Sequence, residues 1–151
     1  MVVFFTMEAQ PNLWKTKINK MLFYADFLNF KKEVQSISGC RYRAINMGPV
    51  PNNFNSLFDY IAENNHNDIT VTSFPNGSIG DQFTPNAKRI FDETKLTKVE
   101  IETLKEVVSK FKKAKTPEII EISHKEEVWK KNFDGGKKLI SYIDAFQLVN
   151  I

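Results

Sequence analysis

His124 is the side chain in this sequence best suited to acid–base chemistry, because three charged residues follow it directly: Lys125, Glu126 and Glu127. A histidine oriented by a carboxylate can act as a general base. The alternative is a structural histidine near the N-terminus of a helix, where the helix dipole disfavours the charged imidazole. A catalytic histidine of this kind needs a nucleophile, and no recognisable Ser or Cys motif accompanies His124. We therefore expect that the protein is not an enzyme.

Tyr24, Asp26 and Cys40 are the other side chains whose chemistry could matter. We expect the Tyr24 hydroxyl to be satisfied within the core, and Asp26 either to face solvent or to accept a hydrogen bond from a neighbouring loop. Cys40 is the only cysteine, so no intrachain disulfide can form, and we expect it to pack as a small hydrophobic residue. One cysteine and two separated histidines argue against a metal site. Nothing in the sequence indicates a cofactor.

The composition is that of an ordinary globular domain. The 151 residues carry a net charge of +3, from 21 Lys and Arg against 18 Asp and Glu, and this excess is too small to indicate nucleic-acid binding. The lysine runs lie among acidic residues and are expected to form a solvated face. No apolar run approaches the roughly 20 residues that span a bilayer, so no membrane partner is expected. A single cysteine indicates a reducing compartment, and we expect a cytoplasmic protein.

One apolar helix must position these side chains. From Ile18 to Phe30, apolar residues recur at helical spacing and cover most of the circumference, which is typical of a helix at the centre of a fold. Thr16 is expected to cap this helix. The Gly-Pro-Val-Pro segment Gly48–Pro51 predicts a stiff turn between two elements. The segment Cys40–Ile45 suits a short strand or a helix, and we favour the helix.

The remaining segments predict further helices and one hairpin. The expected order is a helix over about Asn52–Glu63, a strand over Ile69–Phe74, a turn at Pro75–Gly77 and a returning strand over Ile79–Phe83. Further helix starts are expected at Thr84-Pro85, at Thr97 with Glu100, at Thr116-Pro117, at Ser123 with Glu126 and at Ser141 with Asp144.

These elements together predict an α+β fold. It is predominantly helical and forms a single domain over residues 1–151, built around the central hydrophobic helix and carrying one small β-hairpin. The apolar start, Met1–Gln10, is expected either to pack as a short element or to mark the C-terminal part of a longer protein.

Several short segments, taken in order, resemble the signature of the SocA-like, or Panacea, antitoxin domain. The central helix reads KINKMLFYADF from Lys17 to Phe27, similar to the family's KLnKLLYYADF pattern. The further matches are Ser36–Gly39, Tyr42 with Ala44, Gly48–Pro51, Ser123–Glu126 with Trp129, and Ser141–Tyr142 with Ala145–Phe146. Several motifs in the right order are far more specific than any one of them.

The resemblance implies an antitoxin domain of a bacterial or phage toxin–antitoxin system, which binds and neutralises a cognate toxin protein. An alternative is a proteolytic adaptor, which delivers its partner to a protease, or the regulatory domain of a transcriptional regulator. Longer relatives join such a domain to an N-terminal DNA-binding region. A nucleic-acid partner is therefore expected only through such a region.

The resemblance also singles out candidate site residues, namely Tyr24, Asp26, Gly48, Pro49, Pro51, His124 and Trp129. These residues could line one groove that contacts the toxin, or they could form the structural signature of the fold. We favour the structural interpretation, because Gly and Pro motifs usually fix the shape of the backbone. Trp129 is the best candidate for an interface anchor, since aromatic residues are enriched at binding hot spots.

Overall fold

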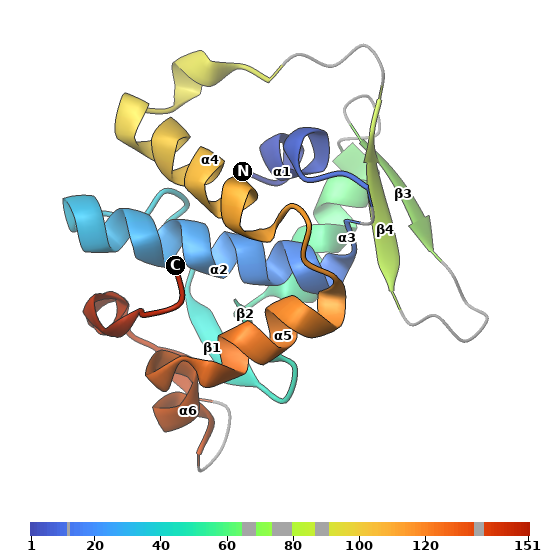
Figure 1. Cartoon of the computed structure of the whole chain (residues 1–151). Helices are drawn as coiled ribbons and strands as arrows, with labels where there is room; N and C mark the ends of the chain where they lie inside the picture. Colours follow the sequence, from blue (N-terminus) through green and yellow to red (C-terminus); the bar gives the residue numbers. More distant parts are fainter. Residues whose placement is uncertain (12, 65–68, 74–79, 87–90, 135–137) are drawn as a thin grey trace.

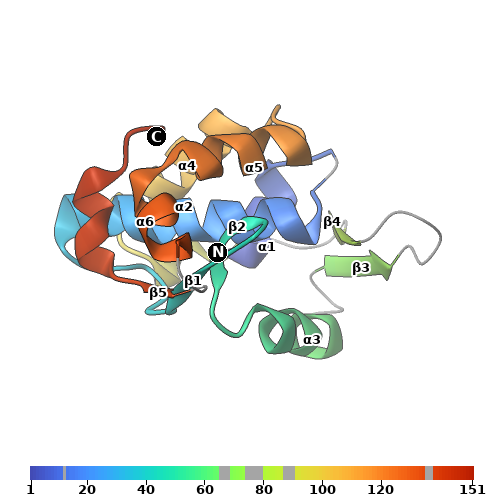
Figure 2. The ribbon, with the colours of Figure 1, turned by 90° about the horizontal axis from the view of Figure 1, so that it is seen from below.

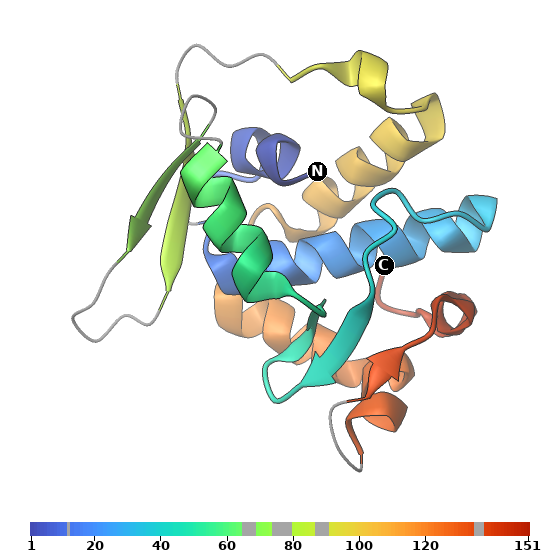
Figure 3. The ribbon, with the colours of Figure 1, turned by 180° about the vertical axis from the view of Figure 1, so that it is seen from behind.

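Helix α2 (Lys15–Glu33) lies at the centre of the molecule (Figures 1 and 3). The structure is a computed structural model that describes residues 1–11, 13–64, 69–73, 80–86, 91–134 and 138–151. Every residue from Lys17 to Asn29 is buried, so the prediction of a central hydrophobic helix is confirmed. The predicted cap is wrong: Trp14 is the N-cap residue and Thr16 lies inside the first turn.

Helices pack on two sides of α2. Figure 1 shows α1 (Val2–Glu8) and α4 (Lys98–Phe111) on one side, and α5 (Thr116–Lys125) on the other. Aromatic rings pack within α2 and between α2 and α4: the Phe23 ring centroid lies 4.4 Å from that of Phe27 in the same helix, and the Tyr24 centroid lies 4.8 Å from that of Phe111 in α4. Ring pairs at these distances add to the stabilisation from burial alone. Helix α1 confirms that the apolar start of the chain packs as a short element.

A three-stranded antiparallel sheet packs against α2 from below in the view of Figure 1, and Figure 2 shows it from that side. It contains β1 (Tyr42–Ile45), β2 (Gly48–Pro51) and β5 (Leu139–Ile140) in the order β2-β1-β5. The helix favoured for Cys40–Ile45 is therefore wrong. Tyr42 and Ala44 are buried while Arg43 and Ile45 are half-buried, which is the alternation of a sheet with one covered face. The turn predicted at Gly48–Pro51 is also wrong, since these residues form β2, an edge strand in which proline is tolerated.

The strands β3 (Ile69–Ser73) and β4 (Asp81–Pro85) form a separate antiparallel pair at one end of the molecule (Figure 1). They confirm the predicted hairpin strands to within two residues. The helix start predicted at Thr84-Pro85 is wrong, because both residues pair with β3. The turn predicted at Pro75–Gly77 lies outside the described residues.

The other helices follow the sequence more closely. Helix α3 (Phe54–Asn64) lies where a helix was predicted, and Thr97 and Glu100 form the predicted capping box of α4. Helix α5 runs without a break to Lys125, so the start predicted at Ser123 with Glu126 is wrong, and α6 (Glu127–Phe133) follows. Short 3₁₀ helices occur at η1 (Glu93–Lys95) and η2 (Tyr142–Gln147).

The predicted class, a mostly helical α+β fold, is confirmed, and the three-stranded sheet adds a β element that was not predicted. Within the described ranges, no helix is both long enough and apolar enough to cross a membrane.

Candidate functional site

The candidate residues lie on four different elements that meet around α2. Tyr24 and Asp26 belong to α2, the Gly48–Pro51 segment is β2, His124 lies in the last turn of α5, and Trp129 lies in α6. His124 was expected at the start of a helix, and this expectation is wrong. The contacts below show what each residue does.

Lys20 fixes β2 to the central helix. Its side chain is fully buried, and its Nζ donates a hydrogen bond to the Pro49 carbonyl oxygen at 3.1 Å. Burial lowers the pKa of Lys20 to about 7. At Gly48, φ is +94°, and a Cβ would lie 2.5 Å from Ser123 Oγ and 2.6 Å from Lys20 Cε. Only glycine fits this position, because both the backbone angle and the space exclude a side chain.

Tyr24 ties α2 to the junction between α5 and α6. Its ring is fully buried, and its hydroxyl donates to Glu126 Oε1 at 3.3 Å. The Glu126 carboxylate also accepts the backbone N–H groups of Val149 and Asn150, each at 3.1 Å. Burial raises the pKa of Tyr24, and the neighbouring carboxylate raises it further. The prediction that the Tyr24 hydroxyl is satisfied in the core is confirmed.

Asp26 holds the loop that precedes β1. Its carboxylate accepts the Ser38 N–H at 2.7 Å, the Ser38 hydroxyl, and the Tyr42 hydroxyl at 2.6 Å. Burial raises the pKa of Asp26, while the hydrogen bonds from Ser38 and Tyr42 act to lower it. Of the two roles left open for Asp26, the structure shows the second, a hydrogen bond to a neighbouring loop.

His124, Trp129 and Phe133 form a stack of rings, which we call the ring ladder. The His124 and Trp129 centroids are 4.1 Å apart with planes 16° apart, and Trp129 and Phe133 are 4.6 Å apart with planes 14° apart. The indole Nε1 of Trp129 donates to the Ile45 carbonyl oxygen at 3.0 Å, at the tip of the β1–β2 hairpin. The ring ladder therefore fastens α5 and α6 to the hairpin.

The surroundings of His124 do not match those of a general base held by a carboxylate. Burial and the positive charge of Lys20 lower the pKa of His124, while a hydrogen bond with the Asn46 backbone acts to raise it. The Nε2 atom is buried and has no hydrogen-bond partner in the described part of the chain. These contacts give the ring a packing role.

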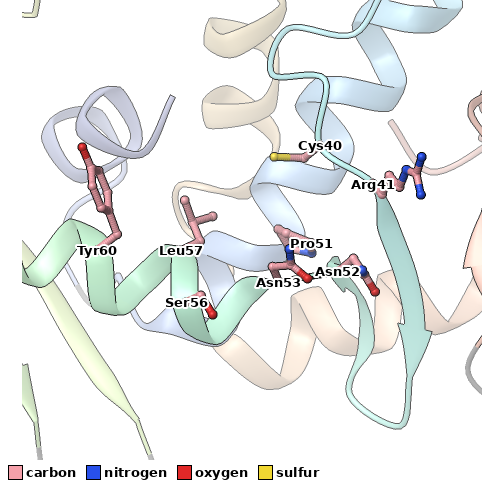
Figure 4. Close-up of a pocket in the computed structure, with 8 residues that line it drawn as sticks. All are labelled: Cys40, Arg41, Pro51, Asn52, Asn53, Ser56, Leu57 and Tyr60. Carbon is pink, nitrogen blue, oxygen red and sulfur yellow. Dashed lines mark hydrogen bonds between the residues drawn. The ribbon is translucent and has the colours of Figure 1, made fainter.

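Two open hollows lie on the surface of the β1–β2–β5 sheet and its surroundings. Figure 4 shows the first, of about 390 Å³, which is lined by Cys40, Arg41, Pro51, Asn52, Asn53, Ser56, Leu57 and Tyr60. The second, of about 550 Å³, is lined by Phe30, Arg41, Leu139, Ile140, Ser141, Tyr142 and Ile143. Pro51 is the one candidate site residue that lines either of these two hollows. The other candidate residues line neither of these two hollows, and the contacts described above tie α2, β2, α5 and α6 together.

Sequence reasoning missed several residues that matter here. Lys20 and Glu126 occur inside the recognised motifs, but nothing in the sequence marks them as buried. Arg41, which directly precedes β1, and Arg43 within it flank Tyr42, and their shared face follows only from the extended segment that was predicted as a helix. A strand assignment for this segment would have placed both arginines on one side of a sheet.

Comparison with protein families identifies the chain. The model of the family described as "Antitoxin SocA-like, Panacea domain" matches residues 18–130. The chain therefore belongs to this family, and the resemblance seen in the sequence is confirmed. The matched region contains all seven candidate residues. Searches of the curated proteins and of the solved structures find no match.

Proposed function

We propose that this protein is an antitoxin domain that binds a cognate toxin protein and neutralises it within their complex. The observation that carries the proposal is the family match over residues 18–130. In a bacterial or phage toxin–antitoxin system, the complex would form in the cytoplasm, where the toxin is made.

The geometry supports a role in binding. Tyr24, Asp26 and Gly48 are buried and hold α2, the hairpin and the α5–α6 junction in fixed positions. Such a frame leaves the surface hollows in a defined shape, and a preorganised surface lowers the conformational cost of binding a partner. We propose binding rather than catalysis for the same reason, since the side chains of Tyr24 and Asp26 are engaged in hydrogen bonds that hold the fold.

Co-expression tests the proposal directly. The protein encoded by the open reading frame beside this gene is expressed from an inducible promoter, alone and together with this chain. We expect arrested growth in the first case, restored growth in the second, and co-purification of the two proteins. A neighbour that stays toxic in the presence of the folded chain would contradict the proposal. If growth returns because the toxin is degraded faster, the protease-adaptor alternative is favoured instead.

A further inference from the structure

Arg41 and Arg43 lie on the same outward side of the sheet. Tyr42 and Ala44 are buried against the core, and successive side chains of a strand point to opposite faces. The two arginines therefore share the outer face and are separated by about 7 Å along the strand, the rise of two residues. Figure 4 shows the Arg41 side chain directed away from the Leu57 and Tyr60 side chains.

Neither guanidinium has a carboxylate partner in the described part of the chain. The Nε atom of Arg43 is buried without a hydrogen-bond partner. An arginine that is half-buried and unpaired has lost part of its hydration without gaining an ion pair. A carboxylate supplied from outside would restore this interaction, and two planar guanidinium groups are well suited to bind carboxylates through paired N–H groups.

Apolar surface flanks the charge of Arg41. Arg41 lines both hollows, and neither hollow has an Asp or Glu among its lining residues. The rims carry exposed hydrophobic side chains: Tyr60 is 60% exposed, Leu139 is 47% exposed and Ile143 is 64% exposed. We call Arg41, Arg43 and the two hollows the arginine face.

We propose that the arginine face is where the toxin docks, through a segment that places carboxylates over Arg41 and Arg43 and apolar side chains in the two hollows that Arg41 lines. The inference rests on the proposed function and adds to it a surface and the chemistry of the partner. Charge complementarity selects an acidic segment. The mixture of arginine, tyrosine and aliphatic side chains is typical of a protein interface, whereas a nucleic-acid surface would carry a longer track of cations along the phosphates.

Charge reversal at Arg41 is the first test, because this residue is exposed and its replacement leaves the core untouched. The affinity of the purified chain for the neighbouring gene's protein is measured by calorimetry, alongside growth rescue. We expect Arg41→Glu to weaken binding by about tenfold or more, and the double variant with Arg43→Glu by about 100-fold. Arg41→Lys keeps the charge but not the paired N–H groups, so it should weaken binding by less than Arg41→Glu.

Lys113→Glu is the matched control, since it makes the same change of charge at an exposed turn after α4. It should alter the dissociation constant by less than about twofold. Far-UV circular dichroism checks that each variant is folded, and Arg41→Glu alone decides the result if the double variant unfolds. Unchanged affinity of folded Arg41→Glu, with a wild type that binds and rescues, overturns the docking surface and leaves the proposed function intact.

Two other outcomes also overturn the inference, in different ways. A wild type that neither binds nor rescues removes the proposed function and the docking surface together. A double variant that keeps its affinity for the toxin but loses affinity for a mixed-sequence duplex DNA would assign the two arginines to nucleic acid.

Discussion

The buried amine of Lys20 makes the free energy of unfolding depend on pH between the lowered pKa of this residue, about 7, and its ordinary pKa of 10.5. Replacement by methionine keeps an unbranched side chain of similar length and removes the charge. Because one pKa unit corresponds to about 1.4 kcal/mol, lowering the pKa of Lys20 from 10.5 to about 7 opposes folding by about 5 kcal/mol below pH 7. The lost hydrogen bond to the Pro49 carbonyl offsets about 1 kcal/mol of the gain from Lys20→Met. The variant should therefore be about 4 kcal/mol more stable than the wild type at acidic pH.

The sign of the pH effect follows from the protons bound in each state. Between pH 7 and pH 10.5 the unfolded chain keeps the proton on Lys20 and the folded chain has lost it. The free energy of unfolding of the wild type should therefore rise by about 1.4 kcal/mol for each pH unit in this window, relative to Lys20→Met. Below the window both states are protonated, and the difference between the two proteins should be constant.

Urea unfolding at several pH values between about 6 and 9.5 measures this difference through the linear dependence of the unfolding free energy on denaturant. Groups that do not interact with Lys20, including Lys17, whose pKa is also lowered by burial, cancel in the comparison. The pKa of His124 is lowered in part by the charge of Lys20, so the slopes are compared above about pH 7, where the imidazole is mostly neutral in both proteins. Lys105→Met, at an exposed position of α4, is the control and should run parallel to the wild type. Parallel curves for wild type and Lys20→Met would refute the reasoning, because they would show that the buried amine does not lose its proton on folding.

Three further substitutions test the frame. Gly48→Ala should lower the unfolding free energy by at least about 2 kcal/mol, because φ is +94° and a Cβ there would meet Ser123 and Lys20. Thermal or urea unfolding measures this loss, and stability equal to that of the wild type would contradict the need for glycine. Tyr24→Phe should cost about 1–2 kcal/mol in the same assay, because it removes one hydrogen bond to a buried carboxylate, and a neutral result would mean that this bond contributes nothing. Trp129→Phe keeps a ring in the ring ladder but loses the hydrogen bond from Nε1 to the Ile45 carbonyl oxygen, so it should lower the unfolding free energy by about 1 kcal/mol. Its toxin affinity should be unchanged. Lost affinity in a folded variant would assign Trp129 to the interface.

The sequence was most informative where local pattern alone decides structure. The apolar residues of α2 recur at helical spacing over a long segment, and the capping box at Thr97 involves residues only three positions apart. Both were predicted correctly because neither depends on a distant part of the chain. Strand β1 was missed because it is only four residues long and because β2, which pairs with it along its whole length, was predicted as a turn. A short segment of mixed character cannot be assigned without that partner.

The candidate site shows the same limit. The spacing of Ser123 and Glu126 fits a capping box, yet Glu126 accepts hydrogen bonds from Tyr24 and from the backbone of residues 149 and 150. The family motif identified the residues that hold the fold, which lie inside it. It gave no indication of Arg41 and Arg43 as a pair, because the motif contains the buried positions Tyr42 and Ala44 and not the outward positions of the same strand.

The complete burial of α2 has a consequence for turnover in the cell. This helix has no solvent-facing stripe between Lys17 and Asn29, so its stability depends on the elements packed around it. Hydrogen bonds hold these elements in place, such as those from Lys17 Nζ to the Lys112 carbonyl oxygen and from Lys31 Nζ to the Leu148 carbonyl oxygen. Local opening of one layer would expose a long apolar helix, and such segments are what chaperones and proteases act on. A partner that holds the outer layers closed would lengthen the lifetime of the chain, and the free protein would be the form removed first.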